Sequence, residues 1–129
     1  MHITKESIPA RIDVPGAKAR QVSDFGDSTG YSMMGGEFFS LATGTDIAPL
    51  LAGLEGDACH APHWGYMIAG SLVVSYRDGS EETCTDGDLF YWPPGHSVRV
   101  TDDAEVVLFS PQVEHLEVMD HMIRSMAQA

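Results

Sequence analysis

The chain has 129 residues, of which 43% are hydrophobic and 20% are charged. This length and composition predict one folded domain over residues 1–129 with a single core, and they exclude a disordered chain. Seven basic and nineteen acidic residues give a net charge of −12, which is the wrong sign for a protein that binds nucleic acid or an anionic membrane.

No stretch of the sequence has the pattern of a targeting or membrane-spanning segment. The first residues, Met1–Ser7, lack the apolar run of a signal peptide, and no stretch reaches the roughly eighteen apolar residues that a spanning helix needs. We therefore expect a cytoplasmic protein. In that compartment Cys59 and Cys84 are expected to be reduced thiols, with Cys84 in a half-buried strand.

The first third of the chain predicts extended structure. Apolar residues between Ile8 and Val14 are separated by prolines and predict short edge strands or an arm on a neighbouring subunit. Residues 31–42 predict one or two strands with a bulge or turn at Gly35–Gly36. Residues 43–53 predict a loop with at most one helical turn, which Asp46 would cap.

The middle of the chain has the clearest strand periodicity. Leu72, Val74 and Tyr76 alternate with smaller residues and lead to an Asp-Gly turn, which predicts a β-hairpin. Further short strands are predicted at 81–85, 89–92, 98–100 and 106–109. Many short antiparallel strands indicate a sandwich or a barrel.

The last segment changes to a helical period. Leu116, Met119, Met122, Ile123 and Met126 recur at intervals of three and four, which predicts one amphipathic helix from residue 114 to about 127. We expect the methionines to face the core or a second subunit.

A thiol and two imidazoles lie within five residues, just before the periodic strands. In a regular strand Cys59, Ala61 and His63 share one face and His60 points the other way. A third imidazole, His96, follows one hairpin later. A thiolate and imidazoles that converge form a chelate suited to zinc. For any single histidine, burial with a backbone partner is the commoner explanation, but clustering favours a metal site.

Two glycine-anchored patterns surround these residues. The first ends at Gly70, and the second contains Gly87, Pro93 and Gly95. In this frame the sequence resembles the cupin superfamily, whose first motif carries His-x-His and then Glu, and whose second carries one more His. The resemblance covers about residues 31–111. It implies an all-β, cupin-type jelly-roll barrel, which the C-terminal α-helix follows.

The ligand set that the resemblance implies differs from the usual one. Asp57 stands at the first histidine position, Cys59 at the second, and His63 at the glutamate position. The histidine of the second motif is replaced by Val98, while His96 lies two residues earlier on the same face of the strand. The candidate ligands are therefore Cys59, His60, His63 and His96.

Other polar and aromatic residues are candidates for a substrate pocket. Glu37 is either a general base or further ligand, or a solvated carboxylate of a strand. Tyr66 and Tyr91 either line the pocket or belong to the core or an interface. His115 and His121 fall on or beside the tail helix, where we expect a solvated face.

Two functions follow from these residues. In the first, the chain is a cupin that holds one divalent metal ion, zinc or next Fe(II), and performs isomerase, lyase or hydrolase chemistry on a small polar molecule in the barrel mouth. In the second, the barrel binds a small ligand or senses pH or metal without catalysis. In both cases we expect a homodimer, in which the N-terminal arm and the tail helix cover the sheet edges of a partner.

Overall fold

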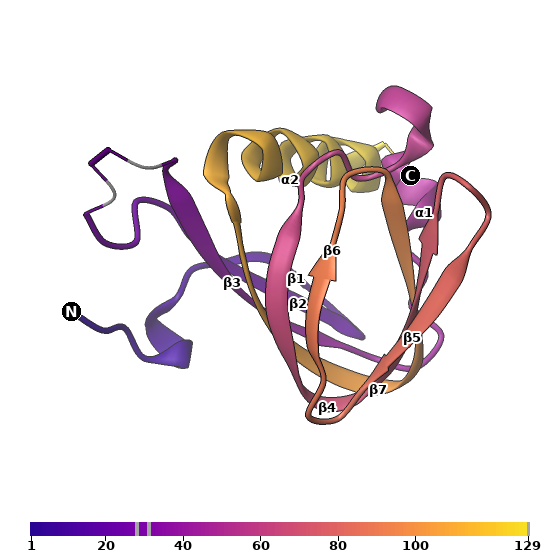
Figure 1. Cartoon of the computed structure of the whole chain (residues 1–129), viewed down its shortest axis with the longest axis horizontal. Coiled ribbons are helices and arrows are strands. Elements are labelled where there is room, and N and C mark those ends of the chain that lie inside the picture. The colour runs from indigo at the N-terminus through magenta and orange to yellow at the C-terminus, as the bar shows by residue number, and fades with distance from the viewer. Residues whose placement is uncertain (28, 31, 129) are drawn as a thin grey trace.

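The computed structural model describes residues 1–27, 29–30 and 32–128 and consists of a curled sheet with a helix across it (Figure 1). Tyr31, at the predicted start of the barrel, lies outside the described residues. The strands are β1 (Ala10–Val14), β2 (Ala17–Val22), β3 (Met34–Leu41), β4 (His63–Tyr76), β5 (Glu81–Thr85), β6 (Leu89–Trp92) and β7 (His96–Pro111). The helices are α1 (Ala48–Leu51) and α2 (Gln112–Ala127), with 3-10 turns η1 (Lys5–Ser7) and η2 (Glu55–Asp57).

All strand pairings are antiparallel, in the order β1-β2-β3-β7-β4-β5, with β6 also paired to β4. Figure 1 shows β4 and β6 in front of β1 and β2, so the sheet curls into a barrel. The largest core cluster lies inside it and includes Met67, Leu72, Val74, Val106 and Leu108. The inward-facing residues alternate with exposed ones along β7, as expected of a half-buried strand.

A sharp bend in β4 and β7 closes the barrel. The two strands pair from Trp64 opposite Phe109 to Tyr76 opposite His96, with register shifts between Met67 and Leu72. Gly70 lies at this bend with φ +84°, and a Cβ built on it would lie 2.0 Å from the carbonyl oxygen of Asp103. Only glycine satisfies both conditions.

Helix α2 covers one opening of the barrel (Figure 1). Its buried residues, His115, Val118, Met119 and Met122, recur at intervals of three and four. Met119 packs with Ile12 and Ala19 of the β1–β2 hairpin, while Val118 and Met122 pack near Cys59. No helix in the described part of the chain is long and apolar enough to cross a membrane.

The predicted all-β barrel with a C-terminal helix is confirmed, and the details differ in two places. The segments predicted as separate strands at 98–100 and 106–109 belong to one strand, β7, because Asp103 accepts hydrogen bonds from Thr43 at the bend instead of forming a turn. Gly35 and Gly36 form no bulge, and β3 pairs residue by residue with β7. Of the two alternatives for the N-terminal segment, the structure has the short strands: β1 lies at the sheet edge and pairs with β2, which pairs with β3 of the same chain.

Candidate metal centre and ligand cavity

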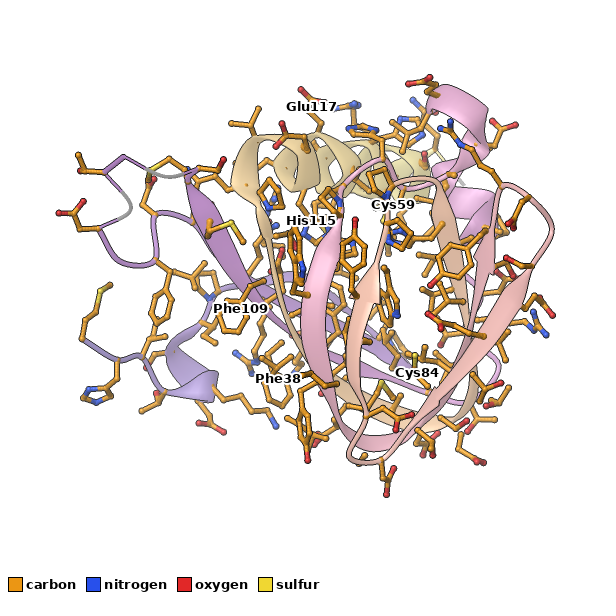
Figure 2. The ribbon with its side chains drawn as sticks, in the orientation of Figure 1. Phe38, Cys59, Cys84, Phe109, His115 and Glu117 are labelled. Atoms are coloured by element: carbon orange, nitrogen blue, oxygen red, sulfur yellow. The ribbon has the colours of Figure 1, made fainter. Side chains whose placement is uncertain are left out.

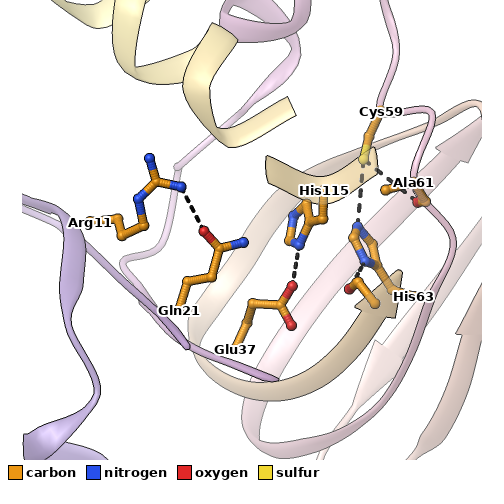
Figure 3. A network of polar contacts seen from close by, with 8 residues as sticks. Arg11, Gln21, Glu37, Cys59, Ala61, His63 and His115 are labelled. Atoms are coloured by element: carbon orange, nitrogen blue, oxygen red, sulfur yellow. Dashed lines mark hydrogen bonds and ion pairs between the residues drawn. The ribbon is translucent and has the colours of Figure 1, made fainter. Parts of the chain in front are cut away.

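Cys59, His63 and His96 come together at one end of the barrel. Backbone hydrogen bonds hold Cys59 beside the start of β7: its amide donates to the carbonyl of His96 at 2.9 Å, and its carbonyl accepts from the amide of Gly95 at 2.7 Å. One donor atom from each of Cys59, His63 and His96 lies within 4.8 Å of the other two, and all three residues are buried. Figure 3 shows the thiol of Cys59 pointing at the ring of His63.

Each of the two imidazoles has one nitrogen engaged by an oxygen. His63 Nδ1 lies 2.6 Å from Ser110 Oγ, and His96 Nδ1 donates to the carbonyl of Pro93 at 2.7 Å. These contacts leave Nε2 of each ring for a further partner. Metal-binding histidines have the same arrangement, in which an oxygen atom outside the metal shell binds one ring nitrogen and the other nitrogen binds the metal. Burial lowers the pKa of His63 well below 6.5 and that of His96 to about 4. Both rings are therefore neutral near pH 7, as a ligand must be.

The thiol of Cys59 is the third donor. Its Sγ lies 3.5 Å from His63 Nε2 and 3.7 Å from the carbonyl oxygen of Ala61. Burial raises the pKa of Cys59 to about 12, so without a cation the group is a neutral thiol that donates to one of these atoms. Zinc bond lengths of about 2.3 Å to sulfur and 2.0 Å to nitrogen place two tetrahedral ligands about 3.5 Å apart. The distance between Cys59 Sγ and His63 Nε2 therefore matches two ligands of one zinc ion, and a donor atom of His96 lies within 4.8 Å of both residues' donor atoms.

A second buried polar pair lies beside this cluster. His115 Nδ1 contacts Glu37 Oε1, both side chains are almost fully buried, and the rings of His115 and His63 are 4.4 Å apart between centroids. Burial raises the pKa of Glu37, although His115, Ser110 and Gln21 act in the opposite direction. Glu37 Oε2 has no hydrogen-bond partner of good geometry. Figure 3 shows this pair and the Cys59–His63 contact side by side.

Two residues of the predicted ligand set lie away from the cluster. The ring of His60 points outward, with Nε2 3.1 Å from Glu117 Oε2, and Figure 2 shows Glu117 on the outer side of α2. The alternation of an extended chain accounts for this, because Cys59, Ala61 and His63 are buried on one side and His60 lies on the other. Asp57 lies in η2, where its carboxylate accepts from the amide of Gly53 at 2.9 Å. The structure therefore assembles the cluster without His60 or Asp57.

The two tyrosines predicted to line a pocket lie outside the barrel. Tyr66 is 46% exposed and Tyr91 is 47% exposed, and Tyr91 stacks on Trp64 with ring centroids 5.1 Å apart. The pairing of β4 with β6 explains their position: His63 and its partner Trp92 face inward, so the next pair, Trp64 and Tyr91, faces out. Tyr66 and Tyr91 therefore line a separate, open groove on the outer face of the sheet and not the cavity beside the ligand cluster.

A cavity of about 180 Å³ extends from the metal-ligand cluster through the barrel interior. Cys59, His63, His96 and His115 line one part of it, and Val98, at the second motif's histidine position, also lines it. The rest of the lining is almost entirely aliphatic and aromatic side chains from the strands, from α2, and from α1 with the loop before it. The cluster is therefore the main polar feature of an apolar chamber.

Comparisons with known proteins identify this architecture. Oxalate decarboxylase of Lactobacillus farciminis superposes with a TM-score of 0.60 and 20% identity, covering 84% of this chain and 32% of that one. The chain has a cupin fold. Ectoine synthase of P. lautus superposes with a TM-score of 0.59 and 15% identity, and the polyketide cyclase RemF of Streptomyces resistomycificus with 0.57 and 16%. Each match covers 86% of this chain and 78% of the other.

These similarities establish the fold of the chain and leave its reaction open. The chain spans about a third of the length of the oxalate decarboxylases that it matches. No protein-family model matches the sequence, and no curated protein matches it by sequence.

The sequence prediction missed three buried polar residues, Gln21, Ser110 and His115, and left Glu37 undecided. His115 was expected on a solvated face but is 3% exposed. The helical period contained a usable signal, because residue 115 lies three and four positions before the buried Val118 and Met119. For Glu37 the strand register was the signal, since alternate residues of β3 pair with inward-facing residues of β7.

Proposed function

We propose that this cupin binds one divalent metal ion through Cys59, His63 and His96 and acts on a small molecule held in the barrel. The observation that supports this is the convergence of one thiol and two imidazoles, each imidazole with its second nitrogen engaged by an oxygen. A thiolate among the ligands favours zinc, with Fe(II) as the second choice. Three protein ligands leave a coordination position for water or substrate.

The residues around the cluster suit proton-transfer chemistry. A bound divalent ion would polarise a carbonyl group or supply a hydroxide near neutral pH. His115 lines the cavity, and its Nδ1 is held by Glu37, so its Nε2 is the nitrogen that can exchange a proton with a bound molecule. This arrangement favours an isomerase, lyase or hydrolase.

Metal analysis of the purified protein tests the proposal. The protein should be expressed with zinc, iron and manganese supplied, purified without chelators, and analysed for metal per chain. Cys59→Ser, His63→Ala and His96→Ala are each expected to weaken binding at least roughly 100-fold, and Ser110→Ala about 10-fold. His60→Ala is the matched control, since it removes a neighbouring imidazole that faces outward.

Cobalt substitution distinguishes ligation by sulfur from ligation by nitrogen alone. A cobalt-loaded protein should show a sulfur-to-metal charge-transfer band that is absent in Cys59→Ser and present in His60→Ala. Well under one metal ion per chain in the wild-type protein, with its circular dichroism spectrum intact, contradicts the proposal.

Non-catalytic binding of a small ligand is the second candidate function. The observation that favours it is the lining of the cavity, in which apolar residues far outnumber groups able to act on a substrate. The two functions are separated by His115→Gln, which keeps a side chain with an amide at the position of Nε2. If the protein is an enzyme, this variant is expected to abolish turnover. If it only binds a ligand, the affinity of the variant for that ligand is expected to stay within a few-fold of the wild type.

We also propose that the chain forms a homodimer, although by a different surface from the expected one. The N-terminal strands and α2 pack on their own barrel, so neither is available as an arm. Instead, Trp64, Tyr66, Tyr91 and Phe109 expose aromatic rings on the outer face of β4, β6 and β7, each between 42% and 47% exposed. Light scattering should give a dimer mass for the wild type and a monomer mass for Trp64→Glu; a wild-type monomer contradicts the proposal.

A further inference from the structure

The cavity is larger and less polar than metal binding requires. Its volume of about 180 Å³ is close to that of cavities of about 150 Å³ that hold a benzene molecule in other proteins. It is smaller than the roughly 300 Å³ at which pockets begin to hold drug-sized ligands. The space therefore suits one six-membered ring or a branched aliphatic group of similar size.

The walls present hydrocarbon on nearly every side. Leu72, Val98, Val106 and Leu108 contribute from β4 and β7, and their side chains are at most 6% exposed. Ile12 and Ala19 line the opposite side, from the β1–β2 hairpin. A ligand that buries its own hydrocarbon against these walls gains about 25 cal/mol for each Å² of apolar surface removed from water.

Methionines of α2 form the wall that can adapt to a ligand. Met119, Met122 and Met126 line the cavity from the helix that covers the barrel opening. Methionine has three rotatable bonds and a polarisable sulfur, so it fills irregular gaps and packs well against ring edges. Met122 packs in a cluster with Leu51 and Val118, and Met126 packs against Ile12 and Met119, so this wall is made of apolar contacts around flexible side chains.

The charges around the cavity disfavour an ionic ligand. No lysine or arginine is among its described lining residues, so a carboxylate or phosphate would find no basic side chain there. Asp46, at the exposed end of the lining, and Glu37, behind His115, both repel an anion. An organic cation would meet no buried carboxylate among the described lining residues, because Glu37 lies behind His115 and does not line the cavity.

We infer that this cavity binds a neutral, largely apolar molecule about the size of a single ring, with its polar group turned toward Cys59, His63 and His96. This differs from the small polar molecule expected from the sequence. The inference names the class of ligand for the proposed metal site. Only the placement of the ligand's polar group depends on that proposed site. The walls and their charge do not depend on the metal.

Titration of the metal-free, full-length protein with matched probes tests the inference. Benzyl alcohol is the neutral probe, benzoate the anion, benzylammonium the cation, and glycerol the small polar control. Binding is followed by NMR with methyl-labelled methionine. Saturable shifts are expected at Met119, Met122 and Met126, with Met1 and Met34 as internal controls outside the lining. Benzoate and benzylammonium are expected to bind at least about tenfold more weakly.

Labelled histidine rings report where the polar group lies. Benzyl alcohol is expected to shift the ring ¹⁵N signals of His63 and His96 more than toluene does, because only the alcohol offers them a hydrogen bond. His2 and His121, outside the cavity lining, serve as controls.

Two cavity-filling variants test the location. Ala19→Leu and Val106→Leu each add hydrocarbon to the chamber from a different wall and are expected to weaken benzyl alcohol binding at least about tenfold. Lys18→Leu, one residue from Ala19 on the outward-facing side of β2, is expected to leave binding unchanged.

Three results overturn the inference: no saturable shift at the three lining methionines, tighter binding of benzoate or glycerol than of benzyl alcohol, or unchanged binding in both filling variants. Absence of metal from the purified protein leads to none of these results. Failure of the proposed metal site and failure of the ligand class are therefore separate outcomes.

Discussion

Acidification should destabilise the metal-free protein through its buried histidines, and His96 gives the magnitude. Burial lowers the pKa of His96 from 6.5 to about 4. Below pH 6.5 the unfolded chain takes up a proton at this position while the folded protein does not, so the free energy of unfolding falls until the pH reaches the folded pKa. Between pH 7 and pH 4.5 the loss from His96 alone is roughly 2–3 kcal/mol.

Other buried groups modify the total over this range. The pKa of His63 is also lowered by burial, so this residue adds to the loss. Glu37 acts in the opposite direction, because its raised pKa lets the folded protein take up a proton before the unfolded chain does. A single variant is therefore more informative than the total.

His96→Asn isolates the contribution of this ring. The asparagine amide reproduces Nδ1 and can still donate to the carbonyl of Pro93, but it does not titrate. Urea unfolding at pH 7 and pH 4.5 should show that the variant loses roughly 2–3 kcal/mol less than the wild type. His121→Gln, which preserves the bond from Nε2 to Ala52 on the outside of the barrel, is the control. Equal losses in the wild type and His96→Asn would refute the reasoning.

Two further predictions concern the bend and the buried pair. Gly70→Ala should lower the free energy of unfolding in urea by at least about 3 kcal/mol, because its Cβ would lie 2.0 Å from the carbonyl oxygen of Asp103. Gly79→Ala is the control: it has a similar φ and nothing within 4 Å, so it should lower the same free energy by only about 1 kcal/mol, and equal losses contradict this account. His115→Leu should lower the free energy of unfolding by about 3 kcal/mol, because it leaves Glu37 buried without its partner. Adding Glu37→Leu should recover most of that stability, whereas additive losses in the double variant would show that the pair is not coupled.

The barrel was predictable because its signals are local. Alternation at Leu72, Val74 and Tyr76, the Asp-Gly turn after them, and the period of the tail helix each depend on neighbours within a few residues. The continuity of β7 through Asp102 and Asp103 was not predictable in the same way. Two successive aspartates are typical of a turn, and only the distant Thr43 provides the hydrogen bonds that hold Asp103 in a strand.

The candidate site was predictable only in part, because its residues come from distant segments. Strand parity correctly separated the inward-facing Cys59 and His63 from the outward-facing His60. Burial of Glu37 with His115 joins residues 78 positions apart, and no local pattern links them. Whether Tyr66 and Tyr91 face the barrel cavity or the outer groove was left open, because aromatic residues on a strand favour either face and the register with β6 decides between them.

The bend at Gly70 connects the fold to the site. His96 and Ser110 begin and nearly end β7, and in a straight strand they would lie about 46 Å apart. In the folded chain both reach His63: Ser110 Oγ lies 2.6 Å from Nδ1, and the rings of His96 and His63 are 4.9 Å apart between centroids. Strand β7 can bend this sharply only where its partner β4 bends with it. Gly70, which allows the bend in β4, therefore also brings His96 and Ser110 to the ring of His63.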